Sequence, residues 1–238
     1  MLGVWLMTFG RRLYVNAKGS VVRLAPTLIH RSPHSVLDPE RLYYYLDALW
    51  QRRNLDGCVL EVGCWRGGTA AIVDQFLRNT GNDRRYICID TFSGFVDEQF
   101  DADLLNGTPP GNRGVFRANP KAVVRKLLDH WGAPSVELVK GDIVCMPDDD
   151  IPVDIAVCLL DVDLEAPVYE GLRRIVPKLV PGGVVLVDDC LETTEWRGAR
   201  VGYAKYCAET GIREEYAFGL GVLRADDPPG PATMGALA

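Results

Sequence analysis

Five short apolar segments that end in glycine or aspartate alternate with helix-like segments from Cys58 onward. The apolar segments are CVLEVG (58–63), RYICID (85–90), VELVKGD (136–142), VDIAVCLLD (153–161) and GVVLVDD (183–189). The fourth is apolar on both faces, as a central strand of a parallel sheet requires. Strands that alternate with helices in this way are typical of βαβ units. With a closing hairpin expected near Gly219, the sequence predicts an α/β fold with a doubly wound, mostly parallel, seven-stranded sheet.

Two regions lie outside this alternation. Residues 1–57 are expected to form a helical N-terminal arm or cap, clearest at 39–49, in front of a domain at 58–225. The arm suits a contact with a second copy of the chain. The end of the sequence, 226–238, is rich in proline and small residues and is expected to be a disordered tail.

One stretch interrupts the domain. Residues 92–119 are first acidic and then rich in glycine, proline and asparagine, which predicts a long loop or lid at about 94–119. At its end, Asn119 is expected to cap the next helix and Pro120 to take that helix's first position.

Charge and cysteine content narrow the function classes. The formal charge of −6 and the pI of about 5.1 disfavour a nucleic-acid partner. The seven cysteines form no CxxC pair, which favours a reducing cytoplasm over a disulfide framework. We see no apolar stretch long enough to span a membrane. A small-molecule substrate is the expectation that remains.

The end of the first strand carries a loop suited to a cofactor. Glu61 lies two residues before Gly63, the first glycine of a GxxxGG pattern, and Thr69 follows this pattern at the start of the next helix, where free N–H groups lie. Dinucleotide sites use GxGxxG to hold a pyrophosphate, and a carboxylate at Glu61 would face that anion poorly. It suits instead the ammonium group of a methionine-derived cofactor, held directly or through water.

Two further strand ends extend this site. Asp90 is placed to accept hydrogen bonds from ribose hydroxyls, and Asp142 lies where an adenine edge could be bonded. An acid at Asp90 also occurs in nicotinamide sites and does not discriminate on its own. Together, the three strand ends favour S-adenosyl-L-methionine as the cofactor.

Four aspartates follow the fourth and fifth strands. They are Asp161, Asp163, Asp188 and Asp189. Carboxylates that converge on one cleft repel each other, and a divalent cation such as Mg²⁺, which prefers oxygen ligands, would relieve this. Asp161, Asp188 and Asp189 are the predicted metal ligands, and Asp163 is the candidate general base. A role for His30 or His34 in the arm stays open.

These residues together resemble the macrocin O-methyltransferase family, which methylates sugar hydroxyls of macrolides and related natural products. The resemblance runs from about residue 36 to 224 and is carried by EVGCWRGGTA, CIDTFSGF, VELVKGD, LLDVDLEAPVYEGLRRIVPKLVPGGVVLVDD and WRGAR. It implies a Rossmann-like class I methyltransferase that uses S-adenosyl-L-methionine, with Mg²⁺ on Asp161, Asp188 and Asp189. Its implied cofactor contacts are Glu61, Gly63, Trp65, Thr69, Asp90, Ser93 and Asp142. It also implies that 94–119 is a mobile lid.

The chain departs from the family pattern near the acceptor. The family usually has Leu-Tyr-x-Ser-Thr after the second aspartate, whereas this chain has Leu-Glu-Ala-Pro-Val at 164–168. The implied function is a metal-dependent O-methyltransferase of antibiotic biosynthesis acting on a natural-product sugar. Three alternatives stay open: a catechol-type phenol as acceptor, a non-catalytic cofactor-binding regulatory subunit, and a nicotinamide-dependent oxidoreductase, the last disfavoured because GxGxxG is absent.

Overall fold

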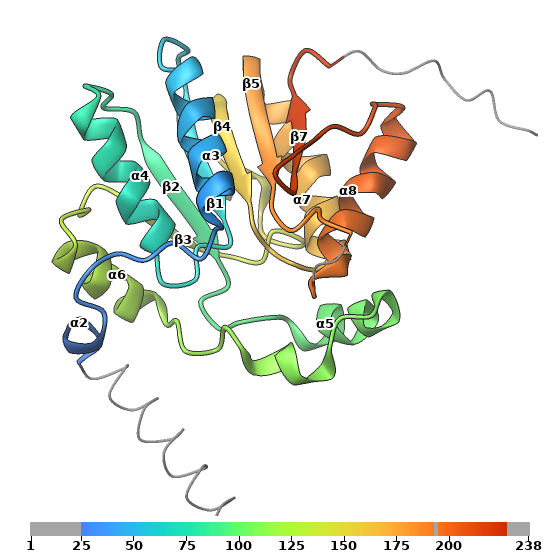
Figure 1. The fold of residues 1–238 in the computed structure, drawn as a ribbon, viewed down its shortest axis with the longest axis horizontal. Coiled ribbons are helices and arrows are strands. Elements are labelled where there is room, and N and C mark those ends of the chain that lie inside the picture. Colours follow the sequence, from blue (N-terminus) through green and yellow to red (C-terminus); the bar gives the residue numbers. More distant parts are fainter. Residues whose placement is uncertain (1–24, 193–194, 228–238) are drawn as a thin grey trace, which may run out of the picture.

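The predicted sheet is confirmed. The computed structural model describes residues 25–192 and 195–227, whose arrangement is shown in Figure 1. Seven strands lie in the order β3-β2-β1-β4-β5-β7-β6. Their bounds are β1 Cys58–Val62, β2 Tyr86–Asp90, β3 Glu137–Lys140, β4 Ile155–Leu160, β5 Leu179–Val187, β6 Tyr216–Ala217 and β7 Leu220–Arg224. Strands β1 to β5 pair in parallel, and β7 is antiparallel to β5 and to β6.

The order of the strands determines where a ligand can bind. From β1 the chain moves outward through β2 to β3 and then returns to β4 on the other side of β1. The connections on the two sides of this point diverge and leave a crevice at the carboxyl ends of β1 and β4. Val62 at the end of β1 is in register with Leu160 at the end of β4, so the residues that follow them are neighbours.

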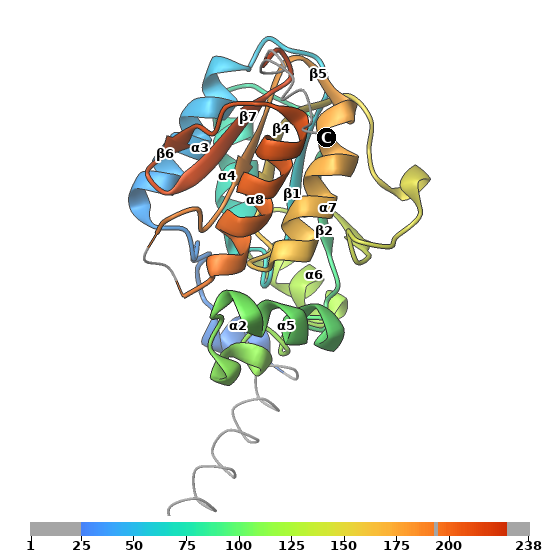
Figure 2. The ribbon, with the colours of Figure 1, turned by 90° about the vertical axis from the view of Figure 1, so that its right-hand side faces the viewer.

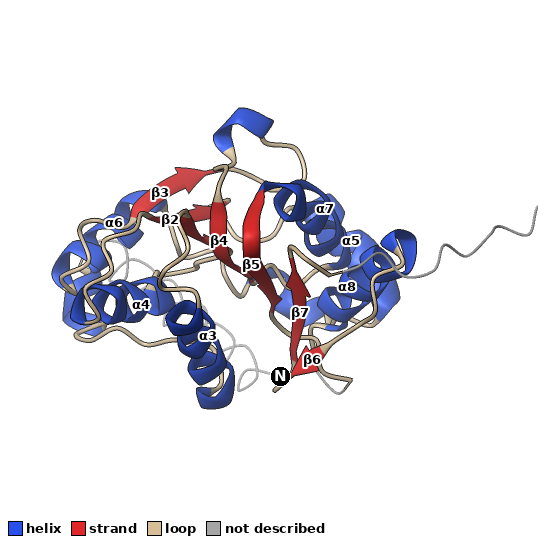
Figure 3. Cartoon of the chain, turned by 90° about the horizontal axis from the view of Figure 1, so that it is seen from above, coloured by secondary structure: helices blue, strands red, loops and turns tan. Residues whose placement is uncertain are grey.

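Helices cover both faces of the sheet (Figure 3). Their bounds are α2 Pro26–Ile29, α3 Pro39–Gln51, α4 Gly68–Asn79, α5 Asp97–Asp103, α6 Lys121–His130, α7 Glu165–Ile175 and α8 Arg197–Thr210. Short 3₁₀ turns lie at η1 Leu104–Asn106, η2 Pro110–Gly114, η3 Asp148–Asp150 and η4 Val176–Lys178. One core joins α3, α4 and α6 to the sheet, and a second joins α7 and α8 to its other face (Figure 2).

Alternation along the strands assigns side chains to these two cores. Val59 in β1 packs in the core of α3 and α4, while Leu60 packs in the core of α7 and α8. The expected helix at 39–49 is confirmed as α3, whose Tyr45 and Leu49 are almost completely buried in the first core. The described part of the N-terminal arm is therefore continuous with the core of the sheet domain.

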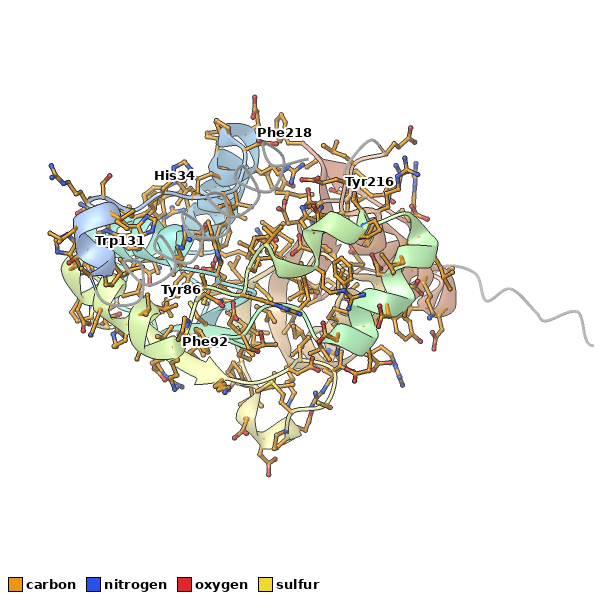
Figure 4. All side chains as sticks on the ribbon, turned by 90° about the horizontal axis from the view of Figure 1, so that it is seen from below. His34, Tyr86, Phe92, Trp131, Tyr216 and Phe218 are labelled. Atoms are coloured by element: carbon orange, nitrogen blue, oxygen red, sulfur yellow. The ribbon has the colours of Figure 1, made fainter. Side chains whose placement is uncertain are left out.

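The stretch expected to be a long loop at 92–119 contains α5, η1 and η2. It lies across the carboxyl ends of the strands (Figures 1 and 4). Asp103 is buried and connects this segment to α7. Its carboxylate accepts a hydrogen bond from the backbone N–H of Glu165 at the start of α7 (2.9 Å) and another from the Thr108 hydroxyl within the segment. The segment is therefore docked against α7, and we call residues 94–119 the lid.

The expected helix cap at Asn119 is wrong. Helix α6 begins at Lys121 with Pro120 as its N-cap residue, and no side chain caps it. The Asn119 side chain instead points away from α6 and donates hydrogen bonds to the backbone oxygen of Trp65 and to Asp90 Oδ1, each at 3.2 Å. These two acceptors, one in the loop after β1 and one at the end of β2, bind the NH₂ group, and the side-chain oxygen that a cap would use accepts no hydrogen bond from α6.

Two expectations reach beyond the described ranges. The predicted tail at 226–238 is described only as far as Asp227, and residues 1–24 of the arm likewise lie outside the description. Within residues 25–192 and 195–227, no helix is long and apolar enough to cross a membrane.

Candidate active site

A cavity of about 390 Å³ opens at the carboxyl ends of β1, β2, β4 and β5. Its acidic lining consists of Asp38, Asp90, Asp142, Asp161, Asp163, Asp188, Asp189 and Glu195. Its aromatic lining consists of Trp65, Phe95, Phe116 and Trp196, of which Phe95 and Phe116 belong to the lid. The crevice predicted from the strand order thus contains all four aspartates that follow β4 and β5.

The loop after β1 approaches the neighbouring strand end closely. Gly63 has a φ of +89°, and a Cβ atom there would lie 1.7 Å from the backbone oxygen of Asp161. Only glycine fits this position, because the left-handed backbone and the close contact each exclude a side chain. Gly63 lines the cavity, and its place beside the cofactor stays a prediction.

Asp90 organises the loops around it. Its Oδ2 accepts hydrogen bonds from the backbone N–H groups of Cys64 (3.0 Å) and Trp65 (2.9 Å). Its Oδ1 accepts one from the backbone N–H of Phe92 (2.6 Å) and one from Asn119. The predicted ribose-binding residue thus lines the cavity and holds the loop after β1, the turn after β2 and the end of the lid in place.

Glu61 lies behind the cavity and is not part of its lining. It is 2% exposed and accepts a hydrogen bond from the Tyr86 hydroxyl, beneath α3. Burial raises the pKa of the Glu61 carboxyl to about 8, although the Tyr86 hydrogen bond lowers it and the charge of Asp90 raises it further. Its predicted contact with the cofactor ammonium group stays a prediction.

The burial of Glu61 predicts a pH-dependent stability. Because its folded-state pKa lies above the ordinary value of about 4.3, the unfolded chain releases this proton first as pH rises. We therefore expect the Glu61→Gln variant to gain stability relative to the unmodified protein between pH 5 and 8, by up to about 1.4 kcal/mol per pH unit. Urea unfolding at several pH values measures this difference.

Glu137 on β3 provides the matched control. It is paired with Arg85 at 2.7 Å, which lowers the pKa of the Glu137 carboxyl, so it is already ionised throughout that range. The difference between Glu137→Gln and the unmodified protein should therefore stay constant from pH 5 to 8. A constant difference for Glu61→Gln as well would contradict the prediction.

The remaining predicted cofactor residues differ in position. Trp65 lines the cavity, and so does Asp142, whose Oδ2 accepts a hydrogen bond from Gln99 of α5 at 2.7 Å. Ser93 is exposed and is not itself a lining residue, but in the sequence it lies between Thr91 and Gly94, which line the cavity. Thr69 is buried and its hydroxyl contacts that of Ser35 in the arm at 2.9 Å, so it holds the arm rather than lining the cavity.

The two histidines of the arm do not line the cavity. The backbone oxygen of His30 accepts a hydrogen bond from the Trp131 indole N–H at 3.0 Å. The His34 backbone passes over the start of α4, where a Cβ atom on Gly68 would lie 1.9 Å from the His34 oxygen. In Figure 4 the labelled His34 lies on the same side of the molecule as Trp131.

The four aspartates after β4 and β5 share a buried, negatively charged environment. Asp163 and Asp188 are each 7% exposed. Burial first, and then the charge of Asp188, raises the pKa of Asp161 well above its usual range. The pKa of Asp163 is raised in the same way, by burial and then by the charge of Asp189.

The backbone at this site is held in unusual conformations. Strand β4 ends at Leu160, and Asp163, three residues further along the chain, has a φ of +63°. Asp189 (φ +56°) and Trp65 (φ +46°) are also left-handed. Such positions cost about 1–3 kcal/mol each and gather at functional sites, where the surrounding structure maintains them.

Arg41 of α3 neutralises part of this charge. Its Nη1 lies 2.8 Å from Asp188 Oδ1 and 2.9 Å from Asp189 Oδ1, and the residue is only 5% exposed. It is the only cationic side chain among the described residues that line the cavity. The arm therefore contributes a charged residue to the site.

The predicted metal ligands fit a divalent cation by their chemistry. Carboxylate oxygens are what Mg²⁺ prefers, and one guanidinium leaves most of the negative charge of the four aspartates uncompensated. In the described part of the chain, however, no group of three or more His, Cys, Asp or Glu side chains is gathered closely enough to hold a metal ion. Arg41 holds two of the predicted ligands, Asp188 and Asp189.

Among the lining residues that sequence reasoning missed, Arg41 and Asn119 make hydrogen bonds to predicted site residues. A signal for Arg41 was present, because it shares one face of the helix with Tyr45 and Ala48, both of which are buried. An arginine in such an apolar stripe is expected to have a buried acidic partner. Asn119 was predicted to cap a helix, because asparagine is common at helix starts, and its hydrogen bonds to Trp65 and Asp90 were not predicted.

Solved structures define the class of the fold. The O-methyltransferase NovP superimposes with a TM-score of 0.64 at 20% identity, covering 80% of this chain and 81% of that one. The calicheamicin methyltransferase CalS11 gives 0.62 at 22% identity, with 79% of each chain covered. At this identity the likeness concerns the fold, which is that of class I methyltransferases.

The sequence then identifies the family. Residues 35–217 match the family described as Macrocin-O-methyltransferase (TylF), so the chain belongs to that family. It is 29% identical over 143 residues to the 8-demethyl-8-(2,3-dimethoxy-alpha-L-rhamnosyl)-tetracenomycin-C 4'-O-methyltransferase of Streptomyces olivaceus, covering 56% of this chain and 52% of the relative. It is 27% identical over 149 residues to the mycinamicin III 3''-O-methyltransferase of Micromonospora griseorubida, covering 58% and 57%. The chain thus matches little more than half the length of these relatives.

Proposed function

We propose that this protein transfers a methyl group from S-adenosyl-L-methionine to a hydroxyl on the sugar of an antibiotic-type natural product. The observation that carries the proposal is one cavity that joins the Gly63 loop and Asp90 to the aspartates after β4 and β5. The family and its named relatives support it, since one relative's name gives a rhamnosyl group as part of its substrate.

The proposed cofactor site uses the strand ends on one side of the crevice. Gly63 and Trp65 line the cavity at the loop after β1, Asp90 lies at the end of β2, and Asp142 follows β3. The cofactor supplies an electrophilic methyl group. What the chain itself contributes is position, because in-line transfer depends on holding the two reacting groups together.

The proposed acceptor site uses the other side. Asp163 is buried and lines the cavity beside the other aspartates, so its carboxylate is placed to take the proton of the acceptor hydroxyl. Asp161, Asp188 and Asp189 would hold a divalent cation, which lowers the pKa of an oxygen bound to it. The aromatic side chains Phe95, Phe116 and Trp196 would exclude water above the acceptor.

Product analysis tests the proposal. The protein would be incubated with S-adenosyl-L-methionine carrying a deuterated methyl group, together with either rhamnosylated polyketides or simple catechols. We expect deuterated methyl ethers of the glycosides, detected by mass spectrometry. Methylation of catechols alone would assign a phenol acceptor instead.

Calorimetry separates the remaining alternatives. Binding of S-adenosylhomocysteine is expected, and binding of NAD is not. Tight NAD binding would favour the oxidoreductase alternative and contradict the proposal. Cofactor binding with no methylated product from any acceptor would favour a regulatory subunit.

A further inference from the structure

Asn119, the last residue of the lid, carries a buried polar atom with no partner. The residue is 1% exposed, lines the cavity, and its Oδ1 accepts no hydrogen bond from any described residue. Buried polar atoms are almost always paired, so an unpaired one on a residue that lines a cavity points to a group that binds there.

The orientation of this amide follows from its neighbours. Its Nδ2 faces the backbone oxygen of Trp65 and a carboxylate oxygen of Asp90, both at 3.2 Å. Both neighbours are hydrogen-bond acceptors, so the NH₂ group must face them and the carbonyl oxygen must be the unpaired atom. Asn119 therefore offers an acceptor that requires a donor from a ligand.

Asp90 has little capacity left for the same donor. A carboxylate has about four lone-pair sites, and Asp90 already receives four hydrogen bonds. Three come from backbone N–H groups, of Cys64, Trp65 and Phe92, and the fourth comes from Asn119. A ribose hydroxyl at this end of β2 would find a wholly unused acceptor on Asn119, beside Asp90.

We propose that Asn119 Oδ1 accepts a hydrogen bond from a ribose hydroxyl of the adenosyl cofactor, while Asp90 holds the surrounding loops. The inference rests on the proposed function, because it takes that cofactor as the ligand. It makes the last residue of the lid part of the cofactor site. Cofactor binding would then fix the lid through its carboxyl end as well as through Asp103.

The test measures binding by calorimetry to the full chain. The ligands are S-adenosylhomocysteine and its 2′-deoxyribose and 3′-deoxyribose analogues, and the variant is Asn119→Ala. We expect the variant to bind S-adenosylhomocysteine about ten-fold more weakly than the unmodified protein. With the analogue that lacks the bonded hydroxyl, the two proteins should bind equally, while the other analogue should keep the ten-fold difference.

Asn106→Ala is the matched control. Asn106 is also in the lid and its Nδ2 also donates two hydrogen bonds, here to the carboxylates of Asp103 (3.0 Å) and Glu165 (2.9 Å), but it does not line the cavity. Its substitution should leave the affinity for all three ligands unchanged. This control separates a general loosening of the lid from loss of a direct contact.

Several outcomes would overturn the inference. The ratio of affinities between Asn119→Ala and the unmodified protein could be the same for all three ligands, which would assign Asn119 a structural role only. If the variant does not fold, a crystal structure of the unmodified protein with S-adenosylhomocysteine decides, and a ribose oxygen farther than about 3.5 Å from Oδ1 would refute the contact. No binding of S-adenosylhomocysteine to the unmodified protein would refute the proposed function itself.

Discussion

Replacing Asp163 with asparagine is expected to lower kcat by roughly 100- to 10,000-fold, the usual contribution of a general base. Asparagine keeps the size of the side chain and cannot take a proton, so the fold and the cavity should persist. Binding of S-adenosylhomocysteine should stay within about two-fold, because Asp163 lies after β4 on the acceptor side of the cavity. Single-turnover kinetics and calorimetry measure the two quantities.

The control for this prediction is Asp149→Asn. Asp149 is exposed in η3 and does not line the cavity, so its substitution should change neither quantity. A kcat for Asp163→Asn near that of the unmodified protein would remove Asp163 from the chemistry and leave Asp161 as the next candidate for the base.

Removal of divalent metal is expected to have an effect of comparable size. Excess EDTA should lower turnover on the order of a thousand-fold, because an aliphatic hydroxyl is a poor nucleophile without a cation beside it. Added Mg²⁺ should restore the rate. The affinity for S-adenosylhomocysteine should not change, since its proposed contacts lie at the ends of β1, β2 and β3.

A direct binding measurement should accompany the activity assay. Mn²⁺ has an electron paramagnetic resonance signal that reports binding without turnover, and it should bind to the unmodified protein but not to Asp161→Asn. Full turnover in excess EDTA, together with no Mn²⁺ binding, would refute the metal prediction. Arg41 would then be the described cation that compensates Asp188 and Asp189.

The sheet could be predicted because its signals are local. Most strands of the parallel part are apolar runs followed by a glycine or aspartate, and burial on both faces explains that composition in β1 and β4, whereas β3 at the edge of the sheet is only partly buried. The same rule located the crevice, since the carboxyl ends of parallel strands lie at one edge. Gly63 and the aspartates after β4 and β5 were therefore found without any knowledge of distances between them.

The parts that could not be predicted depend on contacts between distant residues. Asn119 fits a helix cap by local preference, and only the fold brings Trp65 and Asp90 close enough to take its amide. Similarly, Glu61 is near a strand end, but it shares the α3 face of β1 with Val59, where the Tyr86 hydroxyl donates a hydrogen bond to its carboxylate. Local preference is weak where a buried partner competes for the same side chain.

The ion pairs of Arg41 have a consequence for how the chain reaches its folded state. Arg41 and Asp188 are separated by 147 residues, so the guanidinium is synthesised long before its acidic partners at the end of β5. Contacts of such sequence separation close large loops and form late in folding. Until β5 joins the sheet, neither charge can be buried at low cost. The cavity should therefore become complete only when nearly the whole sheet has formed, and a chain still being synthesised would lack the paired Arg41 and Asp188.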